Sequence, residues 1–312
     1  MSTDRDLPAE FGFIARHFLS LAGPAALDLR DDAAVLIPPP GRELVVSADA
    51  AIEGVHFRAG DPPDLIARKV LRTNLSDLAA MGADPLGYLL TLAIPPTRDD
   101  AFFAAFAAGL AHDQRQFGLT LLGGDTTAGS AQLVVSITIL GHLAPGTALR
   151  RNGARAGDAL WVSGTIGDAA LGLRDGAHPH LARRYLLPEP RLGLHLAGIA
   201  HAAMDVSDGL VQDAGHLARE SGLAVEIAAA SVPLSAPARA ADALAECLTG
   251  GDDYELLLAV PPEHDAALRD EAARTAIPFT RIGRFLPGVG VRVRDARGDE
   301  MIFERKGWSH VR

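Results

Sequence analysis

The sequence predicts an α+β protein made of two α/β domains, and three observations lead to this fold class. The chain has 312 residues, which suits one large domain or two of ordinary size. Strand-like and helix-like segments follow one another without the regular alternation of one doubly wound parallel sheet. A stretch rich in Gly, Arg and Ala, residues 145–157, separates two halves. We therefore place an N-terminal domain at 1–145 and a C-terminal domain at 146–312.

The elements of the first half are predicted from apolar spacing and from turn residues. A long helix is the clearest of them, because Asp61 can cap its start, Pro62 suits a first turn and Gly82 suits its end. In order, the predicted elements are a helix at 10–22, a turn running into a strand at 27–37, a strand at 44–50, a loop at 53–57, the long helix to Gly82, a strand at 87–94, a helix at 99–117, and strands at 119–122 and 133–140.

The second half begins with an apolar strand, and its elements are also predicted from apolar spacing and turn residues. In order, the predicted elements are a strand at 159–163, a helix from Asp168, a helix at 193–203, a helix at 210–218, a strand at 224–227, a helix around 236–247, a strand at 256–260, a helix at 263–275, and strands near 279–285 and 289–294. The pattern indicates a sheet packed with helices.

Composition excludes several classes of function. The formal net charge of −10 argues against nucleic acid or anionic membrane as a partner, because both call for a basic face. The single cysteine, Cys247, cannot form an internal disulfide. No leader-like start and no apolar run of membrane-spanning length is visible. We expect a soluble cytoplasmic protein.

Lysine is scarce in this chain. Only Lys69 and Lys306 occur among the 29 lysine and arginine residues, and no string matches the phosphate-binding loop that ends in Gly-Lys-Ser/Thr. A protein of this composition that handles nucleotide phosphates has to neutralise them with metal ions, arginine and backbone amides.

Acidic side chains recur at the ends of predicted strands and helices. They are Asp31-Asp32, Asp49, Asp77, Asp125 in Gly-Gly-Asp, and Asp205 and Asp208 in Asp-Val-Ser-Asp. Mg²⁺ prefers oxygen ligands and often joins one or two carboxylates to substrate phosphates. Taken together, these motifs indicate a site for metal ions and an anion.

Each motif alone also has a structural interpretation. Asp77 can face water at the edge of an apolar helix face, and Asp205 and Ser207 can be ordinary helix caps. A lone loop histidine such as His56 is more often a surface or core residue, since no second histidine gives metal-ligand spacing. Trp308 suits either a core position or a face that stacks on a cationic ring.

The order of these strings resembles the thiamine-monophosphate kinase family, within the aminoimidazole-ribonucleotide-synthetase-like (PurM-like) superfamily. The string Asn74–Pro85 is specific for the superfamily, whereas Gly250–Glu255 and Lys306-Gly307-Trp308 favour the kinases. The resemblance covers nearly the whole chain. It implies a PurM-like fold in which the mixed sheet of the N-terminal domain forms a barrel in a homodimer.

The resemblance also implies a function and a set of site residues. The function is ATP-dependent phosphorylation of thiamine monophosphate to thiamine diphosphate, with Asp208 and Asp125 as catalytic residues and ATP as co-substrate. Nucleotide contacts fall on Gly124, Asp125, Arg151 and Ser207, and substrate contacts fall on His56, Asp252 and Trp308. Several Mg²⁺ ions are implied, held by Asp32, Ser47, Ala48, Asp49, Asp77, Asp125, Asp205 and Asp208.

Three residues depart from the family pattern. Arg30 stands where a glycine is usual, Ala48 where threonine is frequent, and Asp252 where glutamate is common. Ala48 therefore offers only a backbone carbonyl, and the shorter Asp252 side chain can require a water to reach substrate.

Two other functions stay open at this point. One is a different ATP-using enzyme of the superfamily that activates an amide or selenide. The other is a non-catalytic nucleotide-binding dimer, against which the complete set of aspartates argues.

Overall fold

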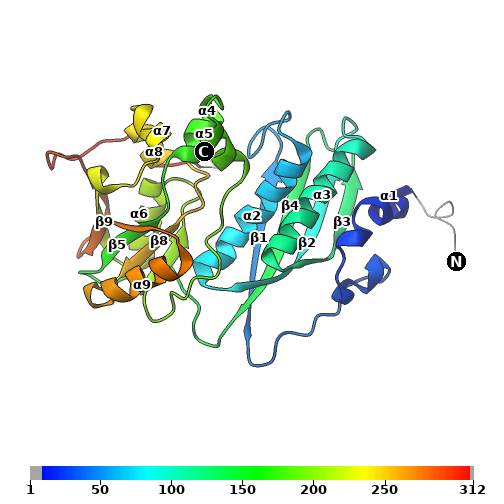
Figure 1. Ribbon diagram of the computed structural model, residues 1–312, viewed down its shortest axis with the longest axis horizontal. Coiled ribbons are helices and arrows are strands. Elements are labelled where there is room, and N and C mark those ends of the chain that lie inside the picture. Colours follow the sequence, from blue (N-terminus) through cyan, green and yellow to red (C-terminus); the bar gives the residue numbers. More distant parts are fainter. Residues whose placement is uncertain (1–8, 310–312) are drawn as a thin grey trace. The chain divides into compact units, whose positions relative to one another are not determined.

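The structure is a computed structural model that describes residues 9–309, and its contacts divide the chain into two units (Figure 1). The first unit contains the described residues up to Leu75 and Asp84–Leu143. The second contains Ser76–Ala83 and the described residues from Ala144 onward. A single boundary at 145/146 stays a prediction, because the short segment 76–83 groups with the later part of the chain.

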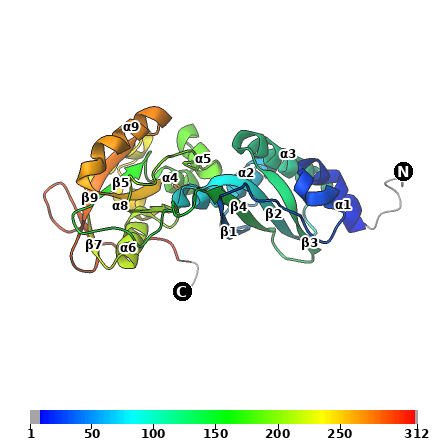
Figure 2. The ribbon, with the colours of Figure 1, turned by 90° about the horizontal axis from the view of Figure 1, so that it is seen from below.

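The first unit is built on a four-stranded mixed sheet. Its strands are β1 (Glu43–Ile52), β2 (Asp84–Ile94), β3 (Thr120–Ala128) and β4 (Val134–Leu143). Their order is β1-β4-β2-β3, in which only β2 and β3 run parallel. Helices α2 (Pro63–Met81) and α3 (Asp100–Phe117) lie on one face of this sheet, as Figure 2 shows.

The two long helices end where the sequence predicts. The Asp99 side chain caps α3 by accepting the Phe102 N–H, and Gly118 closes it at φ 71°. Gly82 adopts φ 73° after α2, and the Ala83 N–H donates to the Leu78 carbonyl in the same turn. Both ends use a left-handed residue, which glycine adopts without steric cost.

Two predictions for the first unit are wrong. The predicted helix at 10–22 is shorter, because α1 (Ala9–His17) gives way to 3-10 turns at Leu19–Leu21 and Pro24–Leu29. No strand forms over 33–37, where Val35 and Ile37 are 65% and 86% exposed. An apolar run needs a paired neighbour to become a strand, and the prolines at 38–40 lack the N–H groups for a ladder.

The Gly-Gly-Asp string lies inside β3 rather than in a loop after it. A Cβ on Gly124 would stand 1.7 Å from the Leu90 carbonyl oxygen of β2. Glycine is therefore required here for the close approach of two strands, and it carries Asp125 on a regular strand.

The second unit is built on a six-stranded sheet. Its strands are β5 (Ala159–Ser163), β6 (Ala202–Asp205), β7 (Ala224–Ala228), β8 (Leu256–Val260), β9 (Phe279–Leu286) and β10 (Gly290–Arg294). Their order is β10-β7-β9-β5-β8-β6, and only β10 and β7 run parallel. Helix α6 (Leu210–Glu220) packs on one face, while α9 (Asp265–Thr275) packs Leu268 among the apolar residues of the other.

Shorter helices complete this unit, and two further predictions for it are wrong. They are α4 (Asp168–Arg174), α5 (Pro179–Leu186), α7 (Ala236–Ala240) and α8 (Leu244–Thr249). The helix predicted at 236–247 is thus two helices, separated by Asp242 at φ 49°. The helix predicted at 193–203 is absent, because Gly193 and Gly198 take positive φ and the segment buries Leu196 in an irregular conformation.

The predicted α+β class is therefore confirmed, with one mixed sheet and its helices in each unit. Within residues 9–309, we find no helix whose length and apolar character would allow it to cross a bilayer.

Candidate active site

In the first unit, Asp49 lies near the end of β1 against helix α2. Its backbone N–H donates to the Asn74 side-chain oxygen at 3.3 Å. Asn74 is fully buried, and its amide nitrogen donates to the Val70 carbonyl at 2.9 Å. Asn74 therefore ties the end of β1 to α2 and holds the backbone of Asp49, whose side chain is exposed.

The register of the sheet separates Asp49 from Asp125. Asp49 pairs with Ile137, Ile137 with Leu90, and Leu90 with Gly124, so these four form one row across the sheet. Asp125 is the next residue of β3, and its side chain alternates to the opposite face. Since β1 and β3 are the two outer strands, Asp49 and Asp125 lie about 14 Å apart, three strand spacings.

His56 has a defined tautomer when neutral. Its Nδ1 accepts the Ile52 N–H at 3.0 Å, so the ring proton resides on Nε2. Ser47 is half-buried on β1, Ala48 is exposed beside it, and Asp32 is exposed in the irregular segment after the 3-10 turns.

In the second unit, Asp205 ends β6 and is 4% exposed. The Ser76 hydroxyl donates to its Oδ2 at 2.8 Å. Burial raises the pKa of Asp205 to about 6, the Asp77 carboxylate acts in the same direction, and Ser76 and Arg151 act against it. Asp77 and Asp205 are therefore near neighbours whose charges repel.

The loop after β6 is held by a residue that sequence reasoning missed. Asp213 of α6 accepts the N–H groups of Ser207, Asp208 and Gly209 on one oxygen, at 3.0, 3.0 and 3.1 Å. Burial raises the pKa of Asp213 to about 8, with Asp205 and Asp208 adding to the effect. The sequence contains one signal for this role, because Asp213 occupies a position on the apolar face of an amphipathic helix.

A second loop, Gly250–Glu255, runs alongside the first. The Asp252 N–H donates to the Ser207 carbonyl at 2.9 Å, and the Tyr254 N–H donates to the Val206 carbonyl at 2.8 Å. A Cβ on Gly251 would stand 2.4 Å from the Ser207 oxygen, so glycine permits the close approach. These contacts bring Asp252 next to Ser207 and Asp208.

The C-terminal segment joins the same loop. The Trp308 N–H donates to the Asp208 carbonyl at 2.9 Å, and Gln212 Nε2 donates to both Asp208 Oδ2 and the Trp308 carbonyl, at 3.0 and 2.6 Å. Trp308 is 50% exposed and Lys306 is exposed, whereas Lys69 is buried. Four predicted residues thus converge within this unit: Ser207, Asp208, Asp252 and Trp308.

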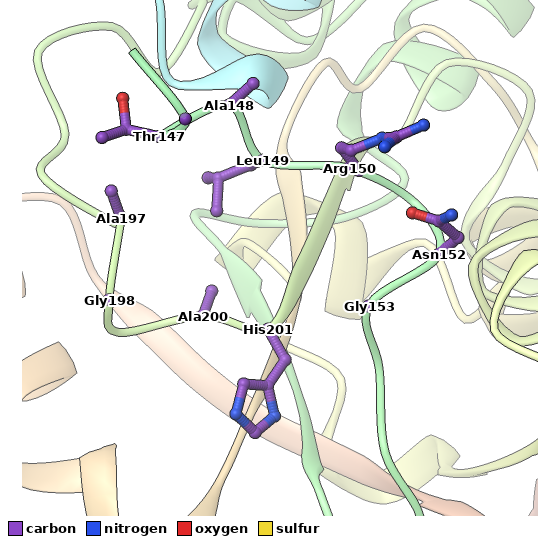
Figure 3. Close-up of a pocket in the computed structure, with 11 residues that line it drawn as sticks. Thr147, Ala148, Leu149, Arg150, Asn152, Gly153, Ala197, Gly198, Ala200 and His201 are labelled. Carbon is purple, nitrogen blue, oxygen red and sulfur yellow. The ribbon is translucent and has the colours of Figure 1, made fainter. Parts of the chain in front are cut away.

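A pocket of about 480 Å³ in the second unit does not contain these residues. Residues 146–150, 152–153, 197–198 and 200–201 line it, with Arg150, Asn152 and His201 as its larger polar side chains (Figure 3). The exposed Arg151 is next to this lining in sequence but is not part of it. The pocket is therefore separate from the loops that carry Ser207 and Asp252.

The donor set of the second unit fits Mg²⁺ by its chemistry. Two repelling carboxylates, one of them buried, gain from a cation, and Mg²⁺ commonly uses one or two carboxylates with substrate oxygens and water. No group of three or more His, Cys, Asp or Glu side chains in residues 9–309 is arranged to hold an ion alone. A protein-only metal cage is thus not present in the part that the structure describes.

Comparison with known proteins assigns the family. Family models match residues 30–143 as "AIR synthase related protein, N-terminal domain" and 155–296 as "AIR synthase related protein, C-terminal domain". The thiamine-monophosphate kinase of Caulobacter vibrioides is 45% identical over 97% of this chain and 91% of its own length. The chain belongs to the thiamine-monophosphate kinase family. The predicted enzyme class, a kinase, is confirmed at this level.

Other members of the thiamine-monophosphate kinase family agree with this assignment. The protein of Salmonella typhimurium is 38% identical over 96% of this chain and 98% of its own length. A crystal structure from Stenotrophomonas maltophilia matches with a TM-score of 0.79 and 41% identity, over 88% of this chain and 91% of that one. The structure titled "AaThiL complexed with AMPPCP and TMP" matches at 0.76 and 31%, over 96% of both chains.

The PurM-like fold is confirmed by the same comparisons. The hydrogenase maturation protein HypE in complex with ATP gives a TM-score of 0.78 at 21% identity, over 96% of this chain and 95% of that one. At that identity the likeness concerns the fold alone.

Proposed function

We propose that this protein phosphorylates thiamine monophosphate with ATP, giving thiamine diphosphate and ADP, as the last step of thiamine diphosphate biosynthesis. The observation that carries the proposal is the convergence of two adjoining loops and the C-terminal segment, which together bring Ser207, Asp208, Asp252 and Trp308 to one place. Family membership supports it, as does a relative whose title names AMPPCP and TMP.

The proposed roles follow the sequence analysis. Gly124, Asp125, Arg151 and Ser207 contact nucleotide, and His56, Asp252 and Trp308 contact thiamine monophosphate. The residues that would hold Mg²⁺ are Asp32, Ser47, the Ala48 carbonyl, Asp49, Asp77, Asp125, Asp205 and Asp208. When bound, Mg²⁺ neutralises charge on the phosphates.

The acceptor of the proposed reaction does not require a strong general base. A phosphate monoester is already ionised near neutral pH, so its oxygen attacks without losing a proton to the protein. The residues of this chain then act by positioning the two substrates so that the attacking phosphate oxygen of thiamine monophosphate lies in line with the bond that breaks in ATP. Direct in-line transfer, without a phosphoenzyme, is the form of the reaction that we propose.

Two side chains suit the acceptor itself. His56 presents Nε2–H, a donor for a phosphate oxygen, because its Nδ1 is occupied by the Ile52 N–H. The exposed indole of Trp308 offers a face for the cationic rings of thiamine, a contact on the order of 1–2 kcal/mol.

The reaction is tested by mass spectrometry of protein incubated with ATP, Mg²⁺ and thiamine monophosphate. We expect thiamine diphosphate and ADP in equal amounts, and no product when EDTA removes the metal. Absence of product under conditions in which ATP still binds would contradict the proposal and favour another ATP-using reaction of the superfamily.

We also propose that the protein acts as a homodimer formed by the first unit. The sheet face opposite α2 and α3 carries exposed apolar side chains, with Leu44, Val46 and Leu89 exposed by 43%, 60% and 37%. A second copy would cover this face, which also carries Asp125, and would remove these apolar side chains from water.

Substitution Val46→Asp tests the dimer. The charge would be buried without a partner in the proposed interface, so we expect light scattering to give a mass near 33 kDa in place of twice that value. Thermal unfolding of the variant checks that the fold survives. A wild-type protein that is already monomeric at micromolar concentration would contradict the proposal.

A further inference from the structure

The loop Gly250–Glu255 holds a conformation that its own sequence does not favour. Asp252 and Tyr254 both lie in the left-handed region, at φ 72° and 51°. A non-glycine residue in this region costs on the order of 1–2 kcal/mol. Contacts outside the loop must therefore hold it in place.

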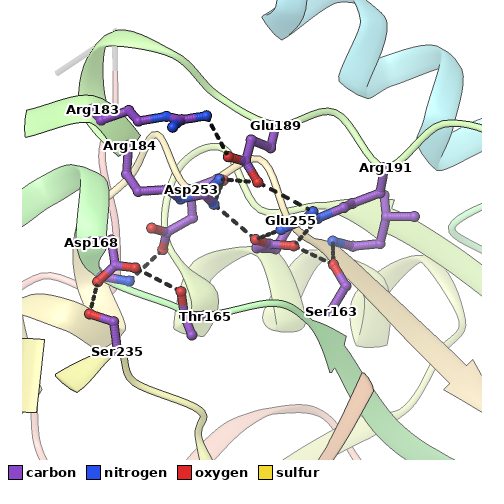
Figure 4. Close-up of polar contacts among 12 residues, drawn as sticks. Ser163, Thr165, Asp168, Arg183, Arg184, Glu189, Arg191, Ser235, Asp253 and Glu255 are labelled. Atoms are coloured by element: carbon purple, nitrogen blue, oxygen red, sulfur yellow. Dashed lines mark hydrogen bonds and ion pairs between the residues drawn. The ribbon is translucent and has the colours of Figure 1, made fainter. Parts of the chain in front are cut away.

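Glu255 is the residue through which most of these contacts run, as Figure 4 shows. Its side chain is fully buried. Arg184 Nη2 donates to Oε1 at 2.8 Å, and Arg191 donates Nε to Oε2 at 2.6 Å and Nη2 to Oε1. Ser163 Oγ donates to Oε2 at 2.5 Å and accepts the Leu256 N–H at 2.8 Å. Both oxygens of this carboxylate therefore accept hydrogen bonds from residues distant in sequence.

The backbone around Glu255 makes room for the carboxylate. A Cβ on Gly164 would stand 2.1 Å from Glu255 Oε1. Arg184 Nη2 also donates to the Asp253 carbonyl at 3.1 Å, so one guanidinium holds two positions of the loop, 253 and 255. The Gly167 N–H donates to Asp253 Oδ2 at 2.8 Å.

The Asp253 side chain accepts the Gly167 N–H, whereas Arg184 donates to the backbone carbonyl of Asp253 and not to its carboxyl. It is 1% exposed, and burial holds its pKa well above the usual range, against the opposing effects of the Gly167 N–H and Arg184. Burial therefore favours the neutral form of this carboxyl. The buried anion that balances Arg184 and Arg191 is Glu255, with the half-exposed Glu189 at 3.5 and 3.6 Å from their Nη1 atoms.

We propose that Glu255, clamped by Arg184 and Arg191, is a positioning residue of the acceptor site. It fixes the strained turn that sets Asp252 beside Ser207 and Asp208, and so determines how well thiamine monophosphate binds. The inference rests on the proposed function for the identity of the acceptor. Glu255 itself is buried behind the loop and does not contact substrate.

The test compares Glu255→Gln with Glu255→Asp and with a matched control, Glu271→Gln. Glu271 is also a buried carboxylate of this unit, 5% exposed and bonded to Arg274 at 2.7 Å, but it contacts neither loop. Trp308 fluorescence reports binding of thiamine monophosphate in a Trp161→Phe background. Trp161 is the other of the two tryptophans, and its indole N–H has no hydrogen bond within the described residues.

Two measurements are made on each variant. Amide hydrogen exchange of residues 250–254, measured without substrate, reports how firmly Glu255 holds the loop. The affinities for thiamine monophosphate and for ATP report how the loop conformation affects ligand binding. For Glu255→Gln we expect faster exchange in the loop and an affinity for thiamine monophosphate weaker by about tenfold, with affinity for ATP within about twofold of wild type. Glu255→Asp should recover part of the loss, and Glu271→Gln should show neither effect.

The inference is overturned if Glu255→Gln leaves exchange and affinity unchanged. It is also overturned if both ligands and the whole unit are affected equally, because the ion pairs are then only structural. Failure of the wild-type protein to bind thiamine monophosphate would instead refute the proposed function. In that case the exchange measurement still decides whether Glu255 fixes the loop.

Discussion

Replacement of Asp208 by asparagine should remove turnover while leaving the fold intact. We expect kcat to fall by about 10²–10³-fold, because an oxygen that serves a metal ion or transferring phosphoryl group loses its charge. The neutral amide oxygen can still accept the Gln212 hydrogen bond that Asp208 Oδ2 accepts at 3.0 Å. Its backbone N–H remains bonded to Asp213.

The measurement is steady-state formation of thiamine diphosphate, with Tm as the check on folding. We expect Tm to stay within about 4 °C of wild type, the shift given by roughly 1 kcal/mol in a domain of this size. Asp175→Asn is a suitable control, since Asp175 is an exposed carboxylate of the same unit. Unchanged turnover in Asp208→Asn would rule out the catalytic and metal roles proposed for it.

Replacement of Asp205 by asparagine should raise the free energy of unfolding and lower kcat. The pKa of this carboxyl is raised from 3.8 to about 6, first by burial and then by Asp77. A carboxyl with a raised folded-state pKa holds its proton more tightly in the folded protein, so ionisation lowers stability as pH rises through this range. At neutral pH and without metal, the full cost is present, about 2–3 kcal/mol from the size of the shift.

An amide at this position carries no such cost and can still accept the Ser76 hydroxyl. We therefore expect Asp205→Asn to raise the free energy of unfolding at pH 7.5 in EDTA by about 2 kcal/mol, with kcat reduced at least tenfold. Urea unfolding at pH 7.5 and at pH 4 measures the difference. The gain should nearly vanish at pH 4, where the wild-type carboxyl is protonated in the folded protein. A variant less stable than wild type at pH 7.5 would contradict this account of Asp205.

The sequence predicts elements well where local signals are strong. Gly82 ends α2 as predicted, and the predicted helix at 99–117 nearly coincides with α3, which Asp99 caps at its start and Gly118 closes at its end. The helix predicted at 193–203 fails because its apolar residues enter the core from an irregular segment, which periodicity does not distinguish from a helix. The conformation of residues 193–203 is therefore determined by tertiary packing rather than by helix propensity.

In the candidate site, too, local motifs can be found in the sequence, whereas the long-range contacts that support them cannot. The Asp205–Gly209 and Gly250–Glu255 strings stand out as motifs, and the structure brings them side by side. Their supports do not stand out, because Arg184 and Arg191 are 71 and 64 residues from Glu255 in sequence. Contacts at such separation leave no local pattern. The roles of the predicted metal and substrate residues stay predictions until they are mutated.

The scarcity of lysine has a practical consequence for chemistry on this protein. Lys69 is 4% exposed, so reagents that acylate amines meet one accessible lysine side chain, that of Lys306. Lys306 precedes Trp308 by two residues and adjoins the segment bonded to Asp208. Labelling of lysine side chains would therefore place a fluorophore, spin label or tether at the edge of the proposed acceptor site, without an engineered cysteine.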